Sequence, residues 1–110
     1  MLYETISKIE AKLRKNEAMK DEQRVELLKL VSTLKGEIAS LSRTHDEQAQ
    51  SIAGFTNLST HEAMREEKNP ELLKLSLQGL SSSVEGFEKS HPQLVGLVNR
   101  IATTLSNMGI

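Results

Sequence analysis

The sequence of 110 residues contains no cysteine and no tryptophan, and aromatic residues make up only 3% of it. Without cysteine the chain cannot form a disulfide scaffold, a thiolate zinc site or a cysteine nucleophile. The charges are nearly balanced, with 14 Lys and Arg against 15 Asp and Glu. A general nucleic-acid-binding protein usually carries a basic excess, so this balance argues against that class.

Long apolar runs are also missing. The uninterrupted runs are short, such as Leu27-Leu28 and Leu97-Val98, whereas a membrane-spanning helix needs about 20 apolar residues. The first residues show no basic region followed by an apolar one, so they do not predict a signal peptide. We therefore expect a cytoplasmic protein.

What the sequence does contain is helical periodicity along most of its length. No stretch alternates with period two for long enough to predict a strand. The two prolines, Pro70 and Pro92, both stand where helix starts are expected. The pattern predicts helices over 2–15, 21–58 or longer, 70–88 and 91–108. We expect one domain over 1–110, all-α, built as an elongated bundle of three to four helices with coiled-coil-like heptad packing.

The second predicted helix carries the clearest pattern, a seam of nine positions spaced alternately by four and three. Its members are Leu27, Val31, Leu34, Ile38, Leu41, His45, Gln48, Ile52 and Phe55. His45 and Gln48 are its polar members, and polar seam residues set register and partner number. A continuous helix from 21 to 66 would be ~69 Å long, far beyond a compact chain with a radius of gyration of ~13 Å. Either this helix breaks, with Gly54 and Asn57 as the favoured place, or the protein is elongated.

The C-terminal third is poor in charge. From Leu94 to Ile110 the only charged side chain is Arg100, and the preceding helix has a weakly polar face of serine, glutamine and glycine. A helix without a strongly polar face is usually buried on more than one side. A small monomer has room for one central helix, so two such helices predict a subunit interface. We assign it to Leu77, Leu80, Leu97, Val98, Ile101, Leu105 and Met108.

Within that set we expect Ile101 and Leu105 in the core, and Leu97 on a second buried face against another helix or a second subunit.

Residues with catalytic or metal-binding potential do not form a recognisable pattern. His45, His61 and His91 lack the spacing of metal ligands on one helix. The acidic residues are spread over predicted solvated faces, and the glycines are isolated rather than gathered in a phosphate-binding loop. We predict a protein that is not an enzyme, with no catalytic residue, no metal and no cofactor.

The C-terminal third nevertheless resembles a known family. Phe87-Glu88-Lys89-Ser90-His91-Pro92, then Asn99-Arg100-Ile101 and the closing Asn107-Met108-Gly109-Ile110, are similar to a family of short bacterial helical proteins known only as a domain of unknown function. Leu27-Leu28-Lys29-Leu30 with Glu37-Ile38 also fits it. The resemblance implies bacterial origin and a helical fold, and it assigns no catalytic residue.

Three functional hypotheses follow. The leading one is a self-associating helical bundle, a dimer being favoured, with a structural or adaptor role and a possible protein partner; nucleic acid and membrane are disfavoured as partners. The second is a regulatory module that binds another macromolecule, protein or DNA, through the basic-rich end at 8–24. The third and weakest is a binder of a small molecule or metal in the bundle core near His45 and Gln48. The apolar stripe of residues 2–13 also suits a membrane surface, although the same stripe is needed for packing.

Overall fold

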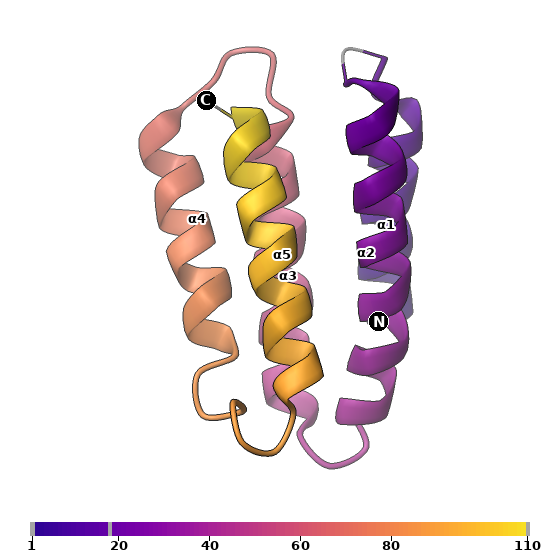
Figure 1. Ribbon diagram of the computed structural model, residues 1–110, viewed down its shortest axis with the longest axis vertical. Helices are drawn as coiled ribbons and strands as arrows, with labels where there is room; N and C mark the ends of the chain where they lie inside the picture. The colour runs from indigo at the N-terminus through magenta and orange to yellow at the C-terminus, as the bar shows by residue number, and fades with distance from the viewer. Residues whose placement is uncertain (1, 18, 110) are drawn as a thin grey trace.

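A computed structural model describes residues 2–17 and 19–109, and Ile110 of the C-terminal motif lies outside them. Over these residues the chain forms five α-helices and no strand. They are α1 (Leu2–Lys15), α2 (Asp21–Leu41), α3 (Asp46–Ala63), α4 (Pro70–Ser83) and α5 (Pro92–Gly109). Successive helices run in opposite directions along the long axis of the molecule (Figure 1). The all-α prediction is confirmed, but the expected three to four helices are five.

The additional helix arises because the predicted long helix 21–58 breaks, and it breaks at 42–45 rather than near Gly54 and Asn57. Polar residues occupy this turn, and Ser42 Oγ donates to Ala39 O over 2.8 Å. Asp46 and Glu47 then begin α3, where negative charge suits the positive end of the helix dipole. Gly54 and Asn57 both lie inside α3.

The loops around α4 show one expected boundary and one shifted boundary. The Asn69 side chain accepts a hydrogen bond from Leu72 N over 3.1 Å, which caps the start of α4 as the Asn-Pro-Glu sequence predicts. At the other end α4 stops at Ser83 and not at residue 88. Gly86 follows with φ of 93°, a left-handed conformation that glycine adopts without strain. Phe87 lies beyond the helix and is still buried.

The helix at the centre of the bundle is α3. It packs against all four other helices, whereas α1 packs only on α2 and α3, and α4 only on α3 and α5. Its buried positions are mostly small: Ala49, Ala53, Thr56, Ser59, Thr60 and Ala63. Small side chains let neighbouring helices approach closely, so α3 contacts all four other helices through one side and keeps its other side exposed.

The packing between α3 and α4 depends on Gly79. A Cβ atom at that position would overlap the Phe55 ring. The aromatic side chain therefore fills the space that the missing Cβ leaves, and this contact sets the antiparallel register of the two helices.

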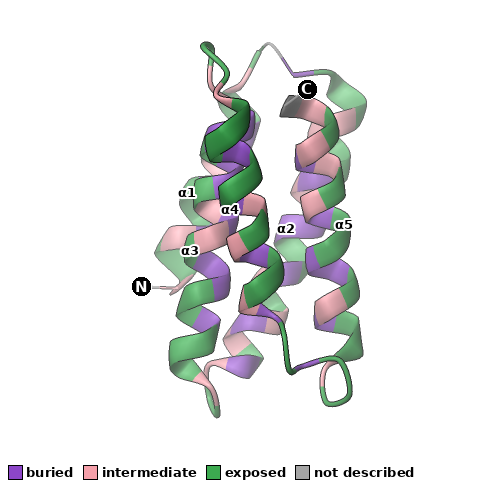
Figure 2. Ribbon diagram, turned by 90° about the vertical axis from the view of Figure 1, so that its left-hand side faces the viewer, coloured by how far each residue is buried: buried purple, intermediate pink, exposed green. Residues whose placement is uncertain are grey.

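The core runs along the length of the bundle, with buried residues on the inward side of every helix (Figure 2). Ile6, Ile9 and Leu13 of α1 belong to it, so the N-terminal stripe serves packing rather than a membrane surface. The radius of gyration is 13.0 Å, with extents of 38 × 25 × 22 Å. That radius is the value of a compact chain of this length, and the expectation of an elongated bundle is wrong because the long helix folds back at 42–45.

Candidate interaction surfaces

Among the described residues, the three histidines that the sequence analysis considered lie at two places in the fold. Within 2–17 and 19–109 no group of three or more His, Asp or Glu side chains is placed to hold a metal ion. His61 is exposed on α3. His45 and His91 stack edge-on with Phe87, the ring centroids lying 5.3 to 6.2 Å apart. This cluster joins the α2–α3 loop to the α4–α5 loop at one end of the bundle.

The prediction that His45 and Gln48 are polar members of a continuous helical seam is wrong. His45 is the residue before α3 rather than a seam position inside a helix, and its Nδ1 lies 2.7 Å from Thr44 Oγ1. Gln48 is exposed on the first turn of α3. Because the chain turns between Leu41 and Asp46, the nine-residue seam is divided between two helices. Neither polar residue lies in the bundle core, so the structure gives no support to a ligand site there.

The residues assigned to a subunit interface lie mostly inside a single chain. Ile101 and Leu105 are core residues, as predicted, and Leu80 and Val98 are equally buried. Leu97 is 9% exposed and contributes to the same core, while Leu77 and Met108 are partly buried at its edge. The charge-poor character of α5 has a different cause from the expected one, because this helix packs on α2, α3 and α4. Its apolar side is covered by its own chain, and the opposite side is exposed with few charges on it.

Exposed apolar surface lies instead on the outer side of α4 and α3. Leu72 is 42% exposed, Leu75 58% and Leu58 44%. The register set by Phe55 and Gly79 brings Leu58, one turn after Phe55, to the level of Leu75, about one turn before Gly79. We call Leu58, Leu72 and Leu75 the leucine patch. Periodicity in the sequence did not single out these three leucines, because it does not show which apolar residue lacks a neighbour.

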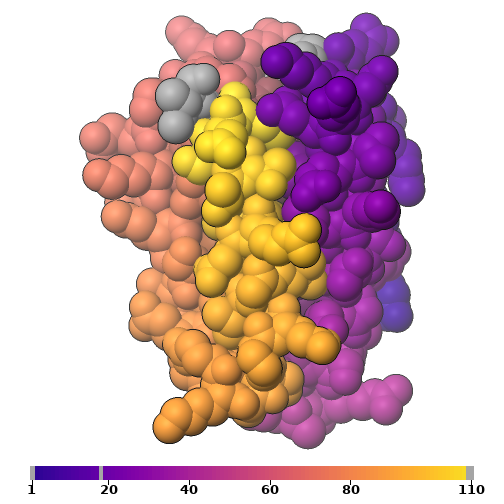
Figure 3. Space-filling view, in the orientation of Figure 1, coloured from indigo at the N-terminus to yellow at the C-terminus, as the bar shows by residue number. Residues whose placement is uncertain are grey.

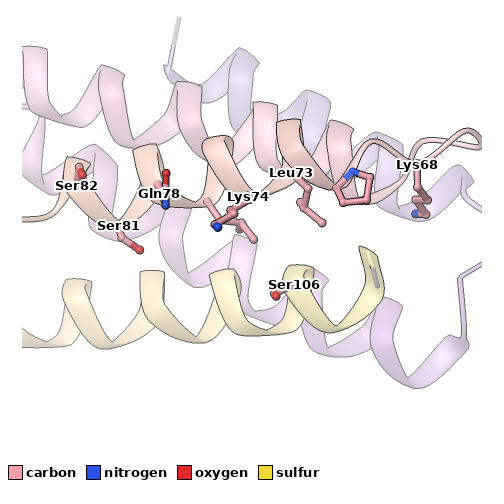
Figure 4. A pocket seen from close by; sticks show the side chains of 9 residues that line it. Lys68, Leu73, Lys74, Gln78, Ser81, Ser82 and Ser106 are labelled. Carbon is pink, nitrogen blue, oxygen red and sulfur yellow. The ribbon is translucent and has the colours of Figure 1, made fainter.

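A groove lies on the other side of α4, between it and α5, with a volume of about 1090 Å³. Leu73 and Ser81 of α4 and Ser106 of α5 point into it (Figure 4). We call it the α4–α5 groove; its lining consists of Lys68, Pro70, Leu73, Lys74, Leu77, Gln78, Ser81, Ser82 and Ser106. On the face shown in Figure 3, α5 is visible along its length, with α4 beside it. The groove thus joins the two charge-poor helices that the sequence identified.

Two cationic side chains of the basic-rich end at 8–24 make hydrogen bonds within the fold. Arg24 donates to the main-chain oxygens of Leu13 and Met19 over 3.1 and 3.2 Å, and also to Asn16 O. It thereby holds the end of α1 against the start of α2. Lys12 Nζ donates to Asn57 Oδ1 of α3 over 3.3 Å. Arg24 and Lys12 therefore connect parts of the same chain.

The same end carries a second cavity, of about 880 Å³. Three methionines line it, from the α1–α2 loop, the end of α3 and the last turn of α5: Met19, Met64 and Met108. Four cations and two carboxylates also contribute: Lys12, Lys15, Arg65, Lys68, Glu17 and Glu66. Flexible thioether side chains adapt to differently shaped partners, a property that sequence spacing did not reveal because the three come from distant segments.

These features describe a small five-helix bundle with exposed apolar side chains and two surface cavities among the residues that the structure describes. Residues 30–110 match the sequence model of the family described as Domain of unknown function (DUF4404), and the chain belongs to that family. The family resemblance of the C-terminal third is thereby confirmed. No curated protein and no solved structure matches the chain. Among the described residues, no helix has both the length and the apolar character to cross a membrane.

Proposed function

We propose that the protein is a non-enzymatic helical bundle that self-associates, a dimer being favoured, and has a structural or adaptor role in a bacterial cell. The leucine patch carries this proposal. It places three large apolar side chains, each more than two-fifths exposed, on the outer face shared by α3 and α4. Clustered apolar side chains on a surface mark interaction sites, whereas single ones need no explanation. A two-fold axis through this face would bring each patch against its copy.

Size-exclusion chromatography with light scattering, at micromolar concentration, tests the proposal. The native protein should elute with twice the mass of one chain, and Leu75→Glu should return it to one chain with an unchanged helical circular dichroism spectrum. Val25→Glu is the matched control, since Val25 is also strongly exposed, at 60%, and lies on α2, which does not pack on α4. A native protein with the mass of a single chain contradicts self-association.

The second candidate function is a regulatory module that binds another macromolecule, protein or DNA, through 8–24. The methionine-lined cavity favours it, because adaptable apolar surface and a cationic rim lie at the same end of the bundle. A labelled DNA duplex titrated at two salt concentrations separates the two partner classes, since binding to DNA weakens steeply with salt. A photo-crosslinker at position 15 should capture a protein partner in cells, while one at position 29, on the exposed side of α2, should not. Absence of both signals contradicts this candidate.

A further inference from the structure

The α4–α5 groove has the form of a site for a helix. Its lining extends along α4 from Pro70 to Ser82, which corresponds to about 18 Å of helix. Its volume of about 1090 Å³ lies at the upper limit of ordinary small-molecule pockets. Leu73 and Leu77, one turn apart, form an apolar floor, and serine and glutamine side chains form the rims. This length and shape suit an amphipathic helix that lays its apolar face between two others.

The charges of the groove indicate what kind of helix it accepts. Lys68 and Lys74 are its only charged lining residues, and both lie towards the end where α4 begins. Lys68 Nζ donates to Ala63 O, a neutral main-chain oxygen. Neither lysine forms an ion pair with a carboxylate of the described residues. The groove therefore has two lysines beside an apolar floor and no acidic residue in its lining.

We propose that the α4–α5 groove binds an amphipathic helix of a partner protein, with leucine-like side chains on the face towards Leu73 and Leu77 and acidic residues at the end near Lys68 and Lys74. This surface is separate from the leucine patch, which lies on the opposite flank of α4. Helix binding in the groove and self-association through the patch are therefore compatible, and each is tested without the other. The arrangement makes the bundle an adaptor with one flank of α4 for its own copy and one for a partner.

Fluorescence polarisation with synthetic peptides of 14 residues tests this proposal. One peptide carries leucines at helical spacing with glutamates on the opposite face, a second replaces the glutamates by lysines, and a third scrambles the acidic sequence. The acidic amphipathic peptide should bind at least tenfold more tightly than either of the others, because only it combines the apolar stripe with complementary charge. Equal binding of the acidic and the basic peptide, or of the acidic and the scrambled one, overturns the proposal.

Charge reversal in the protein locates the site. Lys74→Glu should weaken binding of the acidic peptide about tenfold and make the remaining binding less sensitive to salt. Lys29→Glu is the matched control, since Lys29 is an exposed lysine on α2, and it should leave affinity unchanged. Equal effects of the two substitutions overturn the assignment to the groove.

Light scattering on the same variants separates this proposal from self-association. If Lys74→Glu dissociates the oligomer while Leu75→Glu does not, a second copy of the chain occupies the groove and the partner helix is excluded. If Leu75→Glu gives a single chain that still binds the acidic peptide, both surfaces act as proposed. A native protein of single-chain mass that binds the acidic peptide contradicts self-association and supports the groove.

Discussion

The two terminal helix pairs of the bundle, α1–α2 and α4–α5, are held together by different kinds of side-chain contact. In the first, α1 and α2 are joined by a stripe of isoleucine and leucine and by charge: Lys35 Nζ lies 3.2 Å from Glu10 Oε1 across the pair. In the second, no ion pair joins α4 to α5 among the described residues. Ser76 and Ser83 donate instead to carbonyl oxygens of their own helix, at Leu73 and Leu80.

The difference shows that low charge does not by itself indicate burial. A serine can satisfy its donor on its own helix when it is buried, as Ser76 does, or by bonding to water when it is exposed. Both cases occur on α4, because Ser76 is buried with Leu80 whereas Ser81 and Ser82 are exposed on the lining of the α4–α5 groove. Side chains of α1 and α2 bridge the two helices of the N-terminal hairpin. In the C-terminal hairpin a groove remains between α4 and α5 on the outer side.

The strongest test of the comparison truncates one core leucine in each hairpin. Leu13 and Leu105 are both fully buried, so Leu13→Ala and Leu105→Ala should each lower the free energy of unfolding by about 2–5 kcal/mol. Urea denaturation followed by circular dichroism measures this change. A loss below about 1 kcal/mol for Leu105→Ala alone would mean that the open hairpin collapses around the lost side chain. The core of the C-terminal hairpin would then be less tightly packed than that of the N-terminal hairpin.

A pair of glycines tests the close packing of the C-terminal hairpin on α3. Gly79→Ala should cost about 1–3 kcal/mol, because the new methyl group displaces the Phe55 ring from a filled space. Gly54→Ala should raise stability by up to about 1 kcal/mol, since no atom lies within 4 Å of its new Cβ and alanine favours the helix. Melting temperatures of the two variants should therefore move in opposite directions. A stable Gly79→Ala variant would show that α4 is free to move away from α3.

The smallest expected effect concerns how charge is used in the N-terminal hairpin. Arg24→Ala removes hydrogen bonds to three main-chain oxygens and should cost about 1–2 kcal/mol. Arg100→Ala is the control: its Nη2 lies 3.9 Å from Glu26 Oε1 and both side chains are largely exposed, so its loss should change stability by less than about 0.5 kcal/mol. Both values come from denaturant titration. Equal losses would mean that Arg24 acts only as a surface charge.

Local signals in the sequence predicted local structure well. The stripe of α1 and the Asn69-Pro70 start of α4 depend on neighbouring residues alone, and both occur in the structure. Ile101 and Leu105 were correctly placed in the core. The turn at 42–45 also has a local signal, hydroxyl residues followed by Asp46 and Glu47, but the regular seam across it outweighed that signal. A hydrophobic period shows which side of a helix faces apolar surroundings, and it is the same whether the chain continues straight or folds back.

The candidate interaction surfaces could not be predicted from the sequence, because they depend on which helices become neighbours. The pattern of α5 is that of a helix covered on several sides, and it does not say that its own chain provides the cover. Leu72 and Leu75 have the same composition as core leucines, and they are exposed because no helix packs on that flank of α4.

The central position of α3 also has a consequence for motion. Local opening of α3 must break its contacts with all four other helices, so its hydrogen-bonded amide protons should exchange mainly when the whole domain unfolds. The contact between α3 and α4 is the most extensive of any helix pair, so α4 should open together with α3 rather than before it. The wall that α4 gives to the groove is therefore held in place by α3, and a helix that enters must fit the width that this contact sets.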